Sequence, residues 1–189
     1  MRSPRPARRL WRCLIGMLIL HLAGAAWAQQ SAVRSYPLPE HGTIEFKIPP
    51  SWKDEIQQVK GTVPPTITWS QASGEGFRAL VTVGWQDDQP GDRMSIEEAK
   101  ERVEASMAGL EWKPENDPKV QELRGSSAHG YYFSAADPEP RPGGFKYRTQ
   151  GIALTGELIV AFVLFTSDGQ QQIIYQALAA IGGAIHRAR

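Results

Sequence analysis

The chain has 189 residues, with 21 basic and 20 acidic side chains and a single cysteine. Five arginines and Cys13 lie within the first 13 residues, so the segment after residue 28 keeps 16 basic against 20 acidic side chains, a net charge of −4. A mildly acidic segment has no general electrostatic reason to bind nucleic acid or anionic lipid. Because it has no cysteine, disulfides, iron–sulfur sites and thiol chemistry are excluded from it.

Residues 1–28 have the pattern of a secretory signal peptide. An arginine-rich start precedes an apolar run from Cys13 to Leu22, and Ala26-Trp27-Ala28 fits a cleavage site, with the cut expected after Ala28. The run is shorter than the ~20 apolar residues of a membrane span, so no span is expected after leader removal. The expected location is the periplasm, or the exterior of the cell. A twin-arginine signal at Arg8-Arg9 and a lipid anchor on Cys13 fit the pattern less well.

Residues 29–41 are polar and contain prolines, and a loose N-terminal lead-in is expected there, followed by a single domain over residues 42–189. Alternating polar and apolar side chains predict strands at 43–48, 66–70 and 77–86, the last two joined as a hairpin. Ser95 and Glu98 form a capping box in front of apolar residues at helical spacing. This pattern predicts an amphipathic helix from about 95 to 110.

The second half predicts a three-strand meander and a terminal helix. Strands are expected at 128–136, 145–154 and 157–166, the first two joined by the proline-rich loop 137–144. Ser167-Asp168 is expected to cap a helix with an apolar stripe from Ile173 to Ile185. The strand at 157–166 is continuously apolar from Leu158 to Phe165, which is typical of a strand covered on both faces. The predicted fold class is α+β, a mostly antiparallel sheet with helices on both faces.

Four features of the chain occur together: a strand ending Phe46-Lys47-Ile48-Pro49-Pro50-Ser51-Trp52, the mid-chain amphipathic helix, a strand carrying Gly130-Tyr131-Tyr132-Phe133, and the final apolar strand and helix. With these features the sequence resembles the PsbP-like fold. The stretch from Lys146 to Gly151 is similar to uncharacterised bacterial exported proteins of that type, and the resemblance covers most of residues 42–185. It implies an α/β/α sandwich and a non-enzymatic accessory or binding function. The fold is shared by a photosystem II extrinsic subunit and a Ran-binding import factor. Their contacts with metal ions and with Ran do not carry over to this chain, because no matching residues are identifiable in it.

Catalytic and metal-binding patterns are not recognisable in the sequence. The histidines after the leader, His41, His129 and His186, lie far apart and outside any H-E-x-x-H motif, so neither a metal nor a cofactor is expected. No serine lies in a G-x-S-x-G elbow. We therefore predict a protein that is not an enzyme. The alternative is an envelope hydrolase with a carboxylate pair that sequence spacing does not identify, since such a pair is defined in space.

Aromatic and basic side chains gather on either side of the 137–144 loop. Arginine with aromatic side chains is typical of surfaces that recognise protein partners, although a solvated strand face has the same pattern. The candidate contact surface for a protein partner in the cell envelope consists of Tyr131, Tyr132, Arg141, Lys146, Tyr147 and Arg148.

Overall fold

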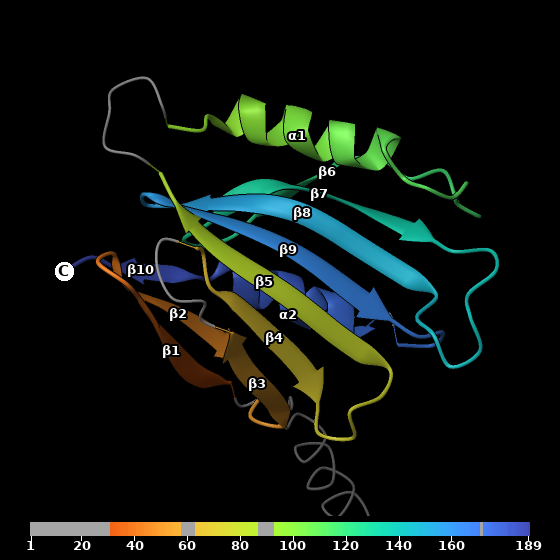
Figure 1. The fold of residues 1–189 in the computed structure, drawn as a ribbon, viewed down its shortest axis with the longest axis horizontal. Helices are drawn as coiled ribbons and strands as arrows, with labels where there is room; N and C mark the ends of the chain where they lie inside the picture. Colours follow the sequence, from red (N-terminus) through yellow and green to blue (C-terminus); the bar gives the residue numbers. More distant parts are fainter. Residues whose placement is uncertain (1–30, 58–62, 87–92, 171) are drawn as a thin grey trace, which may run out of the picture. The chain divides into compact units, whose positions relative to one another are not determined.

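The computed structural model describes residues 31–57, 63–86, 93–170 and 172–189, which form strands and two helices (Figure 1). The predicted signal peptide and its cleavage site lie outside these residues. In chain order the elements are β1 (Ala32–Leu38), β2 (Gly42–Ile48), β3 (Trp52–Gln57), β4 (Thr66–Gln71), β5 (Phe77–Trp85), α1 (Ile96–Ala108), β6 (Gln121–Arg124), β7 (His129–Ala136), β8 (Tyr147–Thr155), β9 (Leu158–Thr166), α2 (Gln172–Gly182) and β10 (Ile185–Arg187).

The main sheet has seven strands in the order β3-β4-β5-β9-β8-β7-β6, and every neighbouring pair is antiparallel. The predicted hairpin of β4 and β5, the meander of β7, β8 and β9, and the mostly antiparallel character of the sheet are confirmed. The register aligns Leu80, Val163, Gln150 and Phe133 across four neighbouring strands. This alignment decides which side chains share a face, because successive residues of a strand point to opposite faces.

A second sheet of three strands, in the order β1-β2-β10, corrects two expectations. The lead-in predicted at 29–41 is wrong for residues 32–38, which pair with β2 and bury Tyr36 and Leu38. Two prolines obscured this strand in the sequence, but β1 is an edge strand, and an edge tolerates Pro37. The apolar stripe predicted for the final helix is also wrong at its end, since Ile185 and His186 belong to β10.

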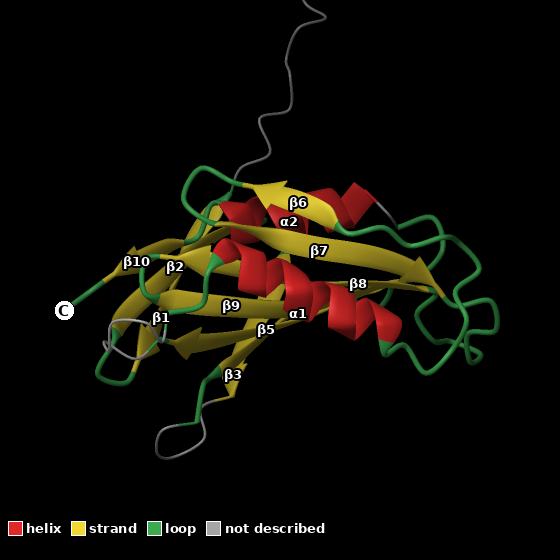
Figure 2. Cartoon of the chain, turned by 90° about the horizontal axis from the view of Figure 1, so that it is seen from above, coloured by secondary structure: helices red, strands yellow, loops and turns green. Residues whose placement is uncertain are grey.

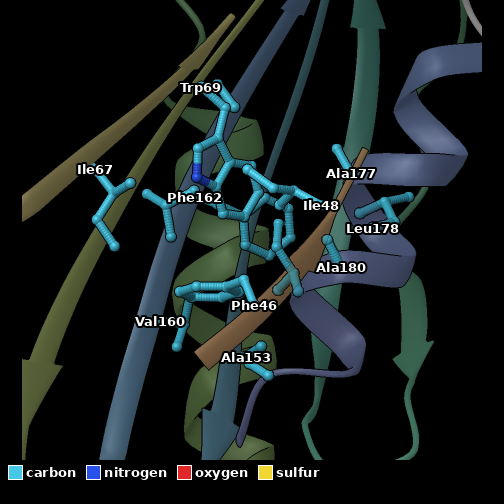
Figure 3. Close-up of a cluster of buried hydrophobic side chains, with 14 of the residues drawn as sticks. Phe46, Ile48, Ile67, Trp69, Ala153, Val160, Phe162, Ala177, Leu178 and Ala180 are labelled. Carbon is cyan, nitrogen blue, oxygen red and sulfur yellow. The ribbon is translucent and has the colours of Figure 1, made fainter. Parts of the chain in front are cut away.

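The main hydrophobic core lies between the two sheets and α2. Its largest fully buried side chains include Trp69, Phe46 and Phe162 (Figure 3). Along β9 the burial alternates strictly: Leu158, Val160, Phe162 and Leu164 are buried, whereas the residues between them are half-buried. The expectation that this strand is covered on both faces is therefore wrong, because only one of its faces is fully buried.

The two helices pack against different apolar clusters. Helix α1 begins after Ser95, whose Oγ accepts from the Glu98 N–H at 3.0 Å, as the capping box predicts. The Glu98 carboxylate, however, pairs with Arg102 (2.7 Å). Helix α1 runs alongside β7 and β8 (Figure 2), over a small cluster formed by Val103, Phe133 and Ala135.

Helix α2 packs against the main core through residues such as Ile181. The predicted cap at Ser167-Asp168 is wrong, since the helix spans Gln172–Gly182 and Asp168 accepts from the Tyr147 hydroxyl. Within the described part of the chain, neither helix is long and apolar enough to cross a membrane. The α/β/α sandwich stays a prediction.

Candidate functional site

Tyr131 and Tyr132 are neighbours on β7 and therefore point to opposite faces of the sheet. Tyr131 packs into the small cluster beneath α1, where the Lys100 ammonium lies 6.0 Å from its ring centre. Tyr132 packs against the main core, and its hydroxyl donates to Gln121 Oε1 at 3.1 Å. Burial raises the pKa of Tyr132. The two tyrosines thus do not share one face.

The loop between β7 and β8 is exposed from residue 138 to residue 144, as the sequence predicts. It is closed at its base by the Asp137 N–H, which donates to the Lys146 carbonyl at 2.8 Å. Within the loop, the Gly144 N–H donates to the carbonyl of Arg141 at 2.7 Å, and Arg141 is exposed. The loop therefore presents Arg141 beyond the end of the sheet.

Lys146 and Tyr147 are each engaged by an acid from a different segment. The Lys146 ammonium lies 3.2 Å from a carboxylate oxygen of Glu115, and the hydrogen bond to this carboxylate raises the pKa of Lys146. The same ammonium is 5.8 Å from the ring centre of Tyr147, whose hydroxyl donates to Asp168 Oδ1 at 3.0 Å. These contacts join the C-terminal side of the loop to the segments after α1 and β9.

Arg148 has no such acid among the residues that the structure describes. Its guanidinium donates through one terminal nitrogen to Gln150 Oε1, and its Nε is buried without a hydrogen-bond partner among the described residues. The side chain lies on the face of the sheet that carries α1, because Arg148 alternates with Tyr147 and is two residues before Gln150. A buried N–H without an acceptor costs free energy, so this position stands out among the predicted residues.

The sheet register brings two further residues to Arg148 that sequence reasoning missed. Phe165 on β9 is paired with both Arg148 and Arg78, and its ring centre lies 5.7 Å from that of Phe145. The Arg78 guanidinium lies 6.0 Å from the Phe145 ring centre. We call the group Arg78, Phe145, Lys146, Arg148 and Phe165 the basic–aromatic edge.

The basic–aromatic edge keeps part of the predicted surface and replaces the rest. Lys146 and Arg148 belong to it, Arg141 lies in the adjoining loop, and Tyr147 contacts Lys146 from the other face. The sequence held no signal for Arg78 and Phe165, because pairing between β5, β8 and β9 is needed to place them together.

Two of the isolated histidines meet in the structure. His186 Nε2 lies 2.8 Å from the backbone carbonyl oxygen of His41, and the His41 ring stacks on Trp85 with 4.4 Å between centres. His186 is thus held on β10, not in a last helical turn. In the ranges that the structure describes, no three histidine, cysteine, aspartate or glutamate side chains gather in a position to hold a metal ion.

The chain matches no family model and has no significant similarity to a curated protein. One solved structure to which it is similar is the solution structure of cyanobacterial PsbP (CyanoP) from Synechocystis sp. PCC 6803. That likeness has 12% sequence identity and a TM-score of 0.46, and it covers 89% of this chain and 99% of the other. That protein carries the name of the family that the sequence resembles. Likeness of fold at this identity does not specify a function.

Proposed function

We propose that this protein is an exported accessory module of the periplasm that binds a protein partner through the basic–aromatic edge and catalyses no reaction. The single observation that carries the proposal is a local excess of positive charge around two half-buried rings. Arg78 and Arg148 form no ion pair within the described residues, and only Lys146 pairs with an acid, Glu115. The rest of the mature chain is mildly acidic, so this edge differs from its surroundings.

The chemistry of the edge favours a partner that presents carboxylates next to apolar side chains. Guanidinium groups bind carboxylates through two parallel hydrogen bonds, and arginine and aromatic side chains are enriched where interfaces are most tightly bound. The loop that carries Arg141 contains three prolines. Because proline restricts the free loop, less conformational entropy is lost when the loop becomes ordered against a partner.

The experiment compares capture of envelope proteins by the exported protein and by an Arg141→Ala/Lys146→Ala double variant. Neither residue lies in the core, and an exposed ion pair contributes about 0–1 kcal/mol, so the variant should melt close to the wild type. We expect quantitative mass spectrometry to show at least one abundant acidic partner with wild type and a several-fold loss of it with the variant.

A matched control removes two other exposed cations: Lys47 on β2, in the second sheet, and Arg124, which pairs with His129 at the end of β7 opposite the loop. The Lys47→Ala/Arg124→Ala variant has the same change in net charge, so it should capture the partner as the wild type does. Equal capture by all three proteins would contradict the edge as the contact surface. Equal losses in both variants would show that capture follows net charge alone. The hydrolase alternative stays a prediction from the sequence.

A further inference from the structure

Helix α1 covers only part of the sheet face on which it lies. It packs on β7 and β8, and the neighbouring strands β9, β5 and β4 continue the same face beyond it (Figure 1). On that face Leu80, Ala161 and Val163 are half-buried, although nearly all their neighbours on the opposite face are fully buried. Apolar side chains are therefore partly open to solvent beside the helix.

These side chains form the floor of a groove of about 460 Å³. One wall is α1, which contributes Val103 and Ser106, and Ile152 of β8 lies at the foot of that wall. The far side is formed by Thr66 and Thr82, whose hydroxyls are 2.9 Å apart and so satisfy each other. The volume lies within the range of small-molecule sites, about 300–1,000 Å³, and an apolar lining with few polar groups is typical of such sites.

A second set of polar groups lies at one end of the groove. Gln150 lines the groove, donates from Nε2 to Ser106 Oγ at 3.2 Å, and accepts through Oε1 from the Arg148 guanidinium. Both polar atoms of Gln150 are thus used, and they fix the guanidinium at the end of the groove. Two acids at this end of the sheet are engaged elsewhere: Glu115 pairs with Lys146 at 3.2 Å, and Asp168 accepts from the Tyr147 hydroxyl.

Arg148 consequently carries a positive charge that no described carboxylate neutralises, and its Nε lacks an acceptor. An anionic ligand at this end would neutralise the guanidinium through its terminal N–H groups. A planar carboxylate suits the fork of a guanidinium, which presents two parallel N–H groups to it.

We propose that the groove binds an aliphatic monocarboxylate, with the carboxylate on Arg148 and the alkyl chain on Leu80, Ala161 and Val163. Burial of an alkyl chain on this floor is favourable because it removes apolar surface from water. A sugar or another polar ligand would leave that surface without apolar contacts. This site goes beyond the partner surface proposed above and does not depend on it, although Arg148 belongs to both.

The experiment measures binding of decanoate to the exported protein by isothermal titration calorimetry, below the critical micelle concentration, with decanol as the neutral comparison. We expect one decanoate per chain and binding about tenfold tighter than that of decanol, since a charge-assisted hydrogen bond is worth more than the 1.4 kcal/mol that separates tenfold affinities. Equal affinities, or no heat with decanoate, would overturn the proposal.

Two variants separate the parts of the site. Arg148→Gln should weaken decanoate about tenfold and leave decanol unchanged, whereas Arg124→Gln, an exposed arginine on β6, should change neither. Ala161→Phe places a ring on the floor and should abolish binding of both ligands. The Ala161→Phe variant should still capture the protein partner, so failure of the groove and failure of the partner surface give different results. Unchanged decanoate binding in Ala161→Phe would show that the ligand lies elsewhere.

Discussion

Replacing Leu164 by alanine should destabilise the domain far more than the same replacement of its neighbour Val163. Leu164 is 0% exposed and lies between Ala79 and Thr149 in the middle of the main sheet. Val163 is half-buried and lines the groove beside α1. A buried leucine changed to alanine costs about 2.7–5 kcal/mol, because the removed atoms lose their transfer free energy and leave a cavity. Val163 loses two partly hydrated methyl groups, which corresponds to about 1 kcal/mol.

Thermal unfolding followed by circular dichroism measures the difference. For a domain of this size, 1 kcal/mol corresponds to roughly 2–4 °C in Tm. Leu164→Ala should therefore lower the Tm by roughly 5–20 °C, and Val163→Ala by about 2–4 °C. Urea denaturation at 25 °C provides an independent estimate of the two free energies. Equal losses, or a larger loss for Val163→Ala, would refute the reasoning, because a shift of one residue in register exchanges the two faces of a strand.

Three further outcomes test other parts of the chain. Burial and the hydrogen bond from Tyr36 to Asp54 raise the pKa of Tyr36 above its ordinary value of 10.0. As the pH rises, the unfolded chain therefore loses the Tyr36 proton before the folded chain does. The stability that Tyr36 contributes is complete below about pH 10 and falls as the pH rises further. Thermal melts between about pH 9 and 11 should show this fall for the wild type and a flatter dependence of Tm on pH for Tyr36→Phe. Ser95→Ala removes the acceptor of the Glu98 N–H and should cost about 1 kcal/mol in urea denaturation. Mass spectrometry of the protein from its host's envelope should find a chain that starts at Gln29, and an intact leader there would contradict export.

The sequence alone determined the elements whose signals are local. The period of two in residues 77–85 and the capping box at Ser95 depend only on near neighbours, and both elements form as predicted. The exposed loop at 137–144 followed from its prolines in the same way. The sequence also identified Lys146 and Arg148 as candidates, because basic side chains next to a predicted loop can be recognised without knowing how the strands pair.

Only the tertiary structure decided the remaining elements. β1 and β10 become strands because β2 offers two free edges, and residues 185–187 reach one of them from the far end of the chain. No local pattern could show β10, since its pairing energy depends on a partner more than a hundred residues away, whereas β1 lies next to β2 in the chain and was obscured by its prolines. The terminal helix therefore ends earlier than its apolar stripe suggested.

The candidate site depends in the same way on contacts between distant segments. The sequence shows Arg148 as one basic residue among several. Only the pairing of β9 with both β8 and β5 places Phe165 beside Arg148 and Arg78 on the other side of Phe165. Whether its charge is neutralised depends on where the acids fall in space, and Glu115 lies against Lys146 instead. The groove likewise exists because α1 is too narrow to cover the whole sheet face, a matter of packing geometry that hydrophobic periodicity does not encode.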